Sequence, residues 1–526
     1  MAMVVAVDAG TTGVRALAVD EQARVVDVAY RELTQHFPRP GWVEHDPDEI
    51  WGATRSTLAE LGGRLAGAGH TVAAVGVTNQ RETLVAFDRS SGRPLHRAVV
   101  WQDRRSAPLC AEMVEAGHLP FVRETTGLVL DPYFSATKAA WLLRHGDLAL
   151  DAGHRHLSFC TVDTWVLWNL TGGTRGGAYV TDPSNASRTL LFDTAARAWS
   201  PELCTLFGVP AHTLPEVRPS AGRVARLVVG DLGPAAAVLE GVPVSGILGD
   251  QQAALFGHAC FVPGMAKVTY GTGSFVLANA GADRPPAPEG LTVSCAWDLG
   301  DHAVPGVGAV AYALEGSAFV SGAAIQWLRD GLGIITSAAE VGPLAASVPD
   351  SGGVTFVPAL TGLGSPWWDP DARGIVTGIT RGAGRAQLAR ACVEAMAFQV
   401  RDMTDAMAAA LSDGSSNGTA GVPAHPLSAL RADRGAAAMD LLLELQSEQS
   451  RMPVARPASL ESTALGAATA AGLAEGVWSS VDELASLWQA DAVFEPQLPA
   501  ELTDAQHAVW RRAVERSMGW AVAGST

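Results

Sequence analysis

Hydrophobic and polar positions at the start of the chain predict a β-hairpin. An apolar run from Val4 to Val7 leads into the segment Asp8-Ala9-Gly10-Thr11-Thr12-Gly13. A second run from Arg15 to Val19 is apolar after its first residue. Two short apolar runs on either side of a small, polar, glycine-rich segment are typical of two strands joined by a turn.

The same pattern returns midway along the chain. The segment 265–270 reads as a strand, Gly271-Thr272-Gly273-Ser274 as a turn, and 275–278 as the partner strand. Two hairpin units about half a chain apart favour a duplicated architecture with two facing lobes. Because strands alternate with helical patterns between and after these units, the fold class is predicted to be α/β.

The clearest helical pattern begins after Gly384. Apolar residues recur there at spacings of three and four, which places them on one face of a helix; they are Leu388, Cys392, Met396, Val400, Met403 and Met407. We expect this stripe to pack into a core. The polar stretch 412–425 predicts an exposed loop. The segment 504–520 predicts a closing helix whose charged face includes Arg512 and Glu515.

Composition and charge exclude several classes of protein. The chain has 526 residues, 48% of them apolar and 17% charged, which is enough to bury substantial cores. Its net charge of −17 argues against nucleic-acid binding through a basic surface. Two of the basic residues are lysines, Lys138 and Lys267. Neither is followed by Ser or Thr, which excludes the lysine-containing P-loop.

Cysteine usage and the start of the chain favour a cytoplasmic protein. The six cysteines are scattered without a C-x-x-C pair, as expected for buried thiols in a reducing compartment. The beginning, MAMVVAVDAG, lacks a basic segment and reaches Asp8 at once, so it does not resemble a signal peptide. Since no apolar run is long enough to span a bilayer, no integral membrane segment is predicted.

The first hairpin carries residues suited to phosphate chemistry. Glycines allow backbone N–H groups to approach phosphate oxygens, and the hydroxyls of Thr11 and Thr12 add donors. Asp8 can hold Mg²⁺ through water, because Mg²⁺ prefers a few carboxylates together with water. Arg15 can offset charge on a transferring phosphoryl group. Taken alone, these residues also fit an ordinary hairpin turn.

Two further stretches hold candidate polar site residues. Asp250 follows Gly249 and precedes an apolar helical pattern, which in isolation favours a helix cap over a general base. The adjacent Arg81 and Glu82 can contact a polyol hydroxyl as donor and acceptor, with Trp101 against the carbon chain. Without further context, a surface ion pair and a core tryptophan explain these last three residues better.

Long motifs, in order along the chain, resemble the FGGY family of carbohydrate kinases, and within it the members that phosphorylate glycerol. The match extends from the first hairpin to about Trp478 and includes TNQRETLVAFDRSSGRPLHRAVVWQDRR, TTGLVLDPYFSATK, TDPSNASRTLLFD, GDQQAALFGHACFVPGMAKVTYGTGSF and LEGSAFVSGAAIQWLRD. The resemblance implies two actin-like, ribonuclease H-like α/β domains with the active site in the cleft between them. We place the N-terminal domain at 1–253 and the C-terminal domain at 254–526.

The resemblance also implies a reaction, which is ATP-dependent phosphorylation of glycerol to sn-glycerol 3-phosphate. Asp250 would be the general base, and Asp8 would lie near Mg²⁺. The glycerol-binding residues would be Arg81, Glu82, Trp101, Tyr133, Asp250, Gln251 and Phe275. The nucleotide site would be formed by Thr11, Thr12, Gly13, Arg15, Thr272, Gly322, Gln326 and Gly435. A homo-oligomer, either a dimer or a tetramer, is also implied.

Two stretches depart from the family pattern. The first hairpin has Ala9 and Gly13 where the family has Gln and Ser, which removes a hydroxyl donor. Farther along, Arg434 replaces the first Gly of an Asp-Gly-Gly-x-x-x-Asn pattern, and Met439 replaces its Asn. Arg is unfavourable where the backbone needs a positive φ, and Met packs on a purine without hydrogen-bonding it well. We therefore expect weakened or altered nucleotide affinity.

Two other functions stay open at this point. One is a kinase for another small polyol, such as erythritol or threitol. The other is a degenerate family member that senses glycerol or binds a partner, with weak nucleotide binding. Arg434 and Met439 support the second alternative. The residues that count against it are the intact Asp8, Arg81, Glu82 and Asp250.

Overall fold

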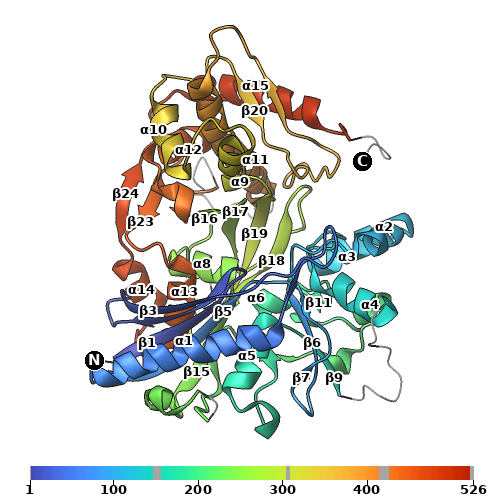
Figure 1. Cartoon of the computed structure of the whole chain (residues 1–526), viewed down its shortest axis with the longest axis vertical. Helices are drawn as coiled ribbons and strands as arrows, with labels where there is room; N and C mark the ends of the chain where they lie inside the picture. Colours follow the sequence, from blue (N-terminus) through green and yellow to red (C-terminus); the bar gives the residue numbers. More distant parts are fainter. Residues whose placement is uncertain are drawn as a thin grey trace.

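A computed structural model of the chain shows two lobes, each built around a mixed β-sheet (Figure 1). The structure describes residues 2–145, 148, 156–230, 232–303, 308–413 and 426–521. Helices flank both sheets, as the alternation of strands and helices predicts.

The first lobe is organised by a six-stranded sheet with the order β14-β15-β5-β1-β2-β3. Strands β1, β2 and β3 pair antiparallel, β5 and β15 continue the sheet in parallel with β1, and β14 is an antiparallel edge. The bounds are β1 (Ala2–Ala9), β2 (Gly13–Val19), β3 (Val25–Glu32), β5 (Thr71–Asn79), β14 (Ala221–Arg226) and β15 (Pro243–Gly249). The predicted first hairpin is therefore confirmed.

Helices cover both faces of this first sheet. Val5 and Val7 of β1 pack with α1 (Pro47–Gly67) and α5 (Val162–Leu170). Val4 and Ala6 point the other way and pack with α8 (Asp250–Gly257) and α13 (Ser462–Ala474). Burial on both faces explains why β1 reads as a continuous apolar run rather than an alternating one.

The second lobe repeats this strand arrangement in a seven-stranded sheet with the order β18-β19-β17-β16-β22-β23-β24. Strands β19, β17 and β16 pair antiparallel, and β22 and β23 then run parallel to β16. The bounds are β16 (Met265–Tyr270), β17 (Ser274–Gly281), β18 (Thr292–Asp298), β19 (Val310–Ala318), β22 (Ala429–Asp433), β23 (Val454–Pro457) and β24 (Ala490–Phe494). The duplicated architecture predicted from the two hairpins is confirmed.

The helices of the second lobe confirm one prediction and correct another. Helix α11 (Arg385–Asp413) buries Cys392, Met396, Val400, Met403 and Met407 completely, while Leu388 is half-buried. The predicted loop at 412–425 overlaps α11, which includes 412 and 413; its other residues lie outside the described ones. The closing helix α15 spans Ala500–Ser517 rather than 504–520, since it starts directly after Pro499 and stops before Gly519, whose φ is 58°.

A small sheet added to the first lobe carries part of the candidate site. It consists of β4 (Glu44–His45), β6 (Leu84–Asp88), β7 (Arg93–Pro94), β8 (Ala98–Val99) and β9 (Leu157–Thr161). Helices α2 (Ala107–Glu115), α3 (Leu119–Thr126) and α4 (Ser135–His145) accompany it. Trp101 follows β8, and Tyr133 precedes α4.

The remaining elements are short. Helices α9 (Gly322–Gln326), α10 (Val341–Ala346) and α12 (Asp440–Ser450) belong to the second lobe, and α6 (Pro183–Ala186), α7 (Pro201–Phe207) and α14 (Val481–Leu487) lie elsewhere. Three two-stranded sheets occur among the described residues. They pair β10 (Val180–Thr181) with β13 (Glu216–Val217), β11 (Phe192–Asp193) with β12 (Ala198–Trp199), and β20 (Thr355–Val357) with β21 (Ile375–Thr377). Among the described residues, none of the helices combines the length and apolar character needed to cross a bilayer.

The late helix α13 returns to the first lobe, where it packs beside β1 and α8 (Figure 1). The contact with α8 is close because both helices present a glycine. A Cβ at Gly466 would lie 1.8 Å from the carbonyl oxygen of Ala253, and one at Gly257 would lie 2.0 Å from that of Ser462. A boundary between 253 and 254 falls inside α8, so the division into 1–253 and 254–526 stays a prediction.

We predict that Gly466→Ala lowers the free energy of unfolding by about 1–3 kcal/mol, because the added methyl group must separate α13 from α8. Gly52→Ala on α1 is the matched control, since a Cβ there would meet nothing within 4 Å. That control should be neutral or gain up to about 1 kcal/mol. Chemical denaturation of both variants checks the prediction, and equal stabilities would contradict the close contact.

Candidate active site

The first hairpin places Asp8 near the end of β1, where its carboxylate is almost completely buried. Burial raises the pKa of Asp8 to about 6, although the nearby charges of Arg434 and Arg15 lower it. Arg15 lies opposite Asp8 on β2 and makes a 2.7 Å ion pair with Glu461. Asp8 is thus a buried carboxylate whose charge is incompletely compensated, which suits it to bind a cation.

The surroundings of Gly13 explain why this chain has glycine where the family has serine. A Cβ at this position would lie 2.3 Å from Cε2 of Tyr30 and 2.6 Å from the carbonyl oxygen of Arg31. The hydroxyl of Tyr30 donates a 3.1 Å hydrogen bond to the carbonyl oxygen of Thr12. In this chain, Tyr30 therefore fills the space that a serine side chain would need. The turn keeps its shape without a hydroxyl at position 13.

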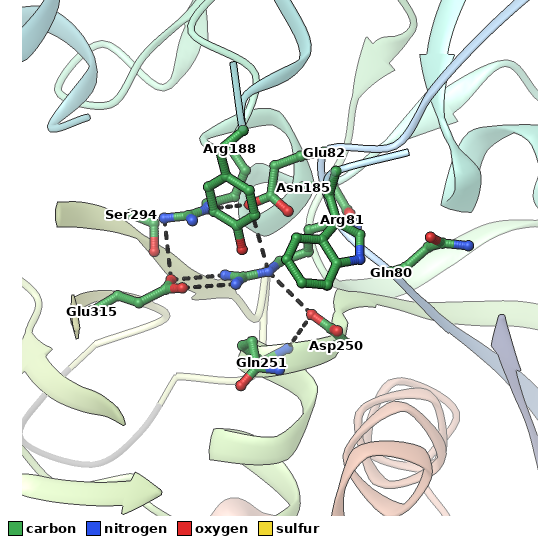
Figure 2. A network of polar contacts seen from close by, with 12 residues as sticks. Gln80, Arg81, Glu82, Asn185, Arg188, Asp250, Gln251, Ser294 and Glu315 are labelled. Carbon is green, nitrogen blue, oxygen red and sulfur yellow. Dashed lines mark hydrogen bonds and ion pairs between the residues drawn. The ribbon is translucent and has the colours of Figure 1, made fainter. Parts of the chain in front are cut away.

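Arg81 is the centre of the second part of the site (Figure 2). Its guanidinium donates to both oxygens of Glu315, at 2.8 and 2.7 Å, and its Nε lies 3.1 Å from Oδ1 of Asp250. Arg81 follows β5 of the first lobe, whereas Glu315 lies on β19 of the second. This buried bidentate ion pair therefore joins the two lobes next to Asp250.

Two further charges complete a buried cluster with Arg81 and Glu315. Nε of Arg188 donates a 2.6 Å hydrogen bond to Glu82, and its Nη1 lies 3.2 Å from Glu315. All four side chains are at most 2% exposed. Although burial raises the pKa of Glu315, the charges of Arg188 and Arg81 lower it to about 2, so this carboxylate is ionised at neutral pH. A surface ion pair at Arg81 and Glu82, favoured without context, is therefore wrong.

Asp250 is the first residue of α8 rather than its cap. The N-cap position belongs to Gly249, and Oδ1 of Asp250 accepts a 2.7 Å hydrogen bond from the backbone N–H of Gln251. The capping role favoured from the isolated Gly249-Asp250 pair is thus wrong, because the helix starts at Asp250 itself, one residue earlier than that role requires. With its side chain 30% exposed above the buried Arg81, Asp250 is accessible to a ligand.

An aromatic wall stands next to these carboxylates. The Trp101 ring meets Tyr133 edge-on at 5.6 Å and Phe275 edge-on at 6.4 Å between centroids. Nε1 of Trp101 donates a 3.0 Å hydrogen bond to the hydroxyl of Thr11. Trp101 therefore connects the first hairpin with the predicted polyol-binding residues, and it is not the core tryptophan favoured without context.

The remaining predicted nucleotide residues lie in the second lobe, in the second hairpin, on α9 and after β22. The carbonyl oxygen of Thr272 accepts hydrogen bonds from Ser321 and Ala323 at the start of α9. Gly322 must be a glycine, because a Cβ there would lie 2.5 Å from the carbonyl oxygen of Gly271. Gln326, at the end of α9, is exposed.

Beyond β22, Gly435 borders open space, since an added Cβ there would meet nothing within 4 Å. Its part in nucleotide binding stays a prediction, as do those of the other predicted nucleotide residues, namely Thr11, Thr12, Gly13, Arg15, Thr272, Gly322 and Gln326.

Arg434 adopts a backbone conformation that is almost exclusive to glycine, with φ 70° and ψ −176°. Such strain typically amounts to about 1–3 kcal/mol. The expected steric conflict of an Arg at this position is thus confirmed. Met439 lies close to α10, because a Cβ at Gly342 would be 3.1 Å from its Cγ. Arg434 and Met439 both lie in the segment that joins β22 to α12.

Three buried charged residues of this region carried no predicted role, namely Arg188, Lys267 and Glu315. Glu315 stands in an otherwise apolar strand, VAYALEGSA, and a buried carboxylate in a strand requires a cationic partner. That signal indicates a partner without identifying it. The partners Arg81 and Arg188 lie 234 and 127 positions away in the sequence, so only the fold brings them together.

The described residues contain no group of three or more His, Cys, Asp or Glu side chains that would hold a metal ion by themselves. A magnesium ion at Asp8 would therefore be held by fewer than three such side chains, together with water and the phosphates of a nucleotide. That ligand set is the one Mg²⁺ commonly has in phosphate-transferring sites.

The chain belongs to the FGGY family of carbohydrate kinases. The N-terminal domain of this family matches residues 3–257, and its C-terminal domain matches residues 266–475. Two lobes, duplicated hairpins and a polar site between β5, α8 and β19 fit this assignment.

Relatives within the family include several glycerol kinases. The chain is 47% identical over 522 residues to glycerol kinase of Bordetella parapertussis, which covers 98% of this chain and 97% of the relative. It is 49% identical over 523 residues to glycerol kinase of Dechloromonas aromatica, covering 98% of each chain. The crystal structure of Plasmodium falciparum glycerol kinase with ADP superposes with a TM-score of 0.88 at 30% identity, covering 98% of each chain. Xylulose kinase of Lactobacillus acidophilus shares the fold, with a TM-score of 0.82 at 18% identity.

We predict that Glu315→Gln destabilises the protein by about 3–5 kcal/mol, because Arg81 and Arg188 would lose their shared buried counter-charge. Glu216→Gln is the control, since Glu216 pairs with Arg218 where both side chains are more than half exposed. The control should change stability by less than about 0.5 kcal/mol. Thermal unfolding monitored by circular dichroism distinguishes the two. Equal, small effects would show that the buried cluster does not hold the lobes together.

We predict that Met439→Asn lowers the KM for ATP, because an amide can hydrogen-bond a purine where a thioether packs without doing so. The expected change is at least about threefold, which corresponds to one modest hydrogen bond. Met518→Asn, at an exposed position beyond α15, is the control and should leave this constant unchanged. Steady-state kinetics with varied ATP give the answer. An unchanged KM for ATP in Met439→Asn would contradict the prediction.

Proposed function

We propose that the protein is a glycerol kinase that transfers the terminal phosphoryl group of ATP to glycerol and forms sn-glycerol 3-phosphate. One observation carries the proposal. The partly exposed carboxylate of Asp250 is held by the buried Arg81 beside an aromatic wall, close to the hairpin that contains Asp8. Relatives at 47–49% identity over nearly the whole chain are glycerol kinases, which supports the same activity.

The substrate pocket supplies both kinds of hydrogen-bonding group that a small polyol requires. Arg81 and Gln251 are donors, Glu82 and Asp250 are acceptors, and Tyr133 carries a hydroxyl that does both. Burial and the charge of Glu82 raise the pKa of Tyr133, so its hydroxyl stays protonated. Trp101 and Phe275 would cover the carbon chain of glycerol.

Asp250 is positioned to accept the proton of the attacking hydroxyl. Its contacts with Nε of Arg81 and the backbone N–H of Gln251 orient the carboxylate. A positioned carboxylate near the reacting hydroxyl contributes by proton removal and orientation. Arg15 would offset negative charge on the transferring group, because such transfer depends mostly on positioning and electrostatics.

ATP enters this mechanism together with Mg²⁺. The ADP bound to the Plasmodium relative supports a nucleotide site in the same fold. Asp8 fits the metal, since it is buried and its pKa is raised to about 6, so that a cation would stabilise its charged form. When bound, Mg²⁺ would supply positive charge to the phosphates, which Thr11, Thr12 and the turn amides would help to hold.

Location and assembly belong to the proposal as well. The six cysteines, all within the described residues, are buried and unpaired, which supports the expected cytoplasmic location. A homo-oligomer stays a prediction from the family resemblance. A degenerate, glycerol-sensing protein is disfavoured, because Asp8, Arg81, Glu82 and Asp250 are all present and Arg81 contacts both Glu82 and Asp250.

We predict glycerol-dependent release of ADP in a coupled assay with ATP and Mg²⁺, and slower turnover with erythritol or threitol. Erythritol and threitol each carry one more CHOH unit than glycerol, and this unit would have to fit against the wall formed by Trp101, Tyr133 and Phe275. A steric mismatch of this size corresponds to roughly 10–200-fold in kcat/KM. Turnover that favours a four-carbon polyol would establish the alternative polyol kinase. Absence of glycerol-dependent turnover would reject the kinase proposal.

A further inference from the structure

The two lysines of this chain share an unusual environment. The sequence contains 37 lysines and arginines together, and only Lys138 and Lys267 are lysines. Both are completely buried, with 0% relative exposure. Lysine is rarely buried unless its ammonium group is paired. In a chain that uses arginine at nearly every other basic position, the remaining lysines therefore occupy specific internal sites.

Lys267 connects the two lobes at the candidate active site. It lies on β16 of the second lobe, and its Nζ donates hydrogen bonds to Oε1 of Gln251 on α8 and, at 3.0 Å, to the hydroxyl of Thr269. Gln251 is the residue whose backbone N–H donates to the proposed base Asp250. The ammonium group thus directly contacts the neighbour of the base.

The chemistry of this contact determines how the Gln251 amide is oriented. An ammonium group has three donors and no acceptor, so it must face the oxygen of the amide and not its nitrogen. Burial lowers the pKa of Lys267 to about 8, against the opposing charges of Asp433, Glu315 and Asp250, so the ammonium form still predominates at pH 7. With Oε1 held by Lys267, the Nε2 group of Gln251 is left as the donor for a ligand.

Lysine is better suited than arginine to this position. The ammonium group is compact and places its donors around a single atom, whereas a guanidinium is planar and larger. Lys267 lies in a site bounded by the Arg81–Glu315 ion pair, Asp250 and Asp433. A second guanidinium would have to fit beside that of Arg81. The smaller ammonium group therefore places a positive charge here with less bulk than a guanidinium would need.

We propose that Lys267 is a positioning residue that fixes the Gln251 amide with its nitrogen toward the substrate. This inference rests on the proposed function. Gln251 then donates to an oxygen of the polyol while Asp250 accepts from its reacting hydroxyl, so the two neighbouring side chains bind the substrate in one defined orientation.

Lys138 provides a matched comparison within the same protein. It is equally buried, and burial lowers its pKa to about 8 as well. Its Nζ donates to the backbone carbonyl oxygens of Tyr133 and, at 3.3 Å, Phe134. Lys138 therefore supports the pocket through the backbone and makes no contact with the Gln251 amide.

A double-mutant cycle between Lys267 and Gln251 tests the proposal at pH 7. We expect Lys267→Met to raise the KM for glycerol at least about tenfold and to leave the KM for ATP within about twofold. In the Gln251→Ala background, the same substitution should raise the KM for glycerol less than about twofold, because the amide that Lys267 orients is already absent. Lys138→Met should have the same effect in both backgrounds.

Lys267→Gln keeps the test informative if Lys267→Met folds poorly, since its amide nitrogen retains a donor. This variant should recover part of the loss in the wild-type background and show the same dependence on Gln251. Equal increases in the KM for glycerol with and without Gln251, in an active enzyme, would overturn the role of Lys267. An inactive wild-type protein would instead reject the proposed function and this inference with it.

Discussion

The bidentate ion pair between Arg81 and Glu315 is the contact on which the rest of the site depends. It joins the end of β5 in one lobe to β19 in the other at 2.7 and 2.8 Å. Buried charges are tolerated only when they are paired, so the positions of Glu82 and Arg188 follow from the same requirement. Because Arg81 also contacts Asp250, the placement of the proposed base is tied to the packing of the two lobes.

This dependence separates the site into a rigid part and a variable part. The polyol side is built from buried charges, an aromatic wall and the Lys267 contact, where most substitutions would leave a charge or donor unpaired. The nucleotide side contains a strained Arg434 and a Met439 that replaces an expected Asn. Arg434 also contributes positive charge near Asp8. The departures from the family pattern therefore lie in the first hairpin and in the segment between β22 and α12, and not in the buried charge cluster of the polyol side.

Several features could be predicted from the sequence, and the reasons differ from one to another. The two hairpins and helix α11 follow from local patterns, because strands and helices have fixed spacings of apolar residues. The positive φ at Arg434 followed from the glycine that the family has there. The cap assigned to Asp250 failed because the start of a helix cannot be located to one residue from composition alone. The pairing of Glu315 with Arg81 and Arg188 could not be predicted from the sequence, because it depends on contacts between segments far apart in the chain.

The central claim is that Asp250, held by Arg81, removes the proton from the attacking hydroxyl of glycerol. A rapid-quench measurement of a single turnover in Asp250→Asn tests it most directly, together with glycerol binding measured by calorimetry. The account predicts that phosphoryl transfer slows by about 10²–10⁴-fold while glycerol affinity changes only a few-fold, because the amide keeps the shape but does not accept the proton as a base. Phosphoryl transfer within a few-fold of the wild-type rate would contradict the account.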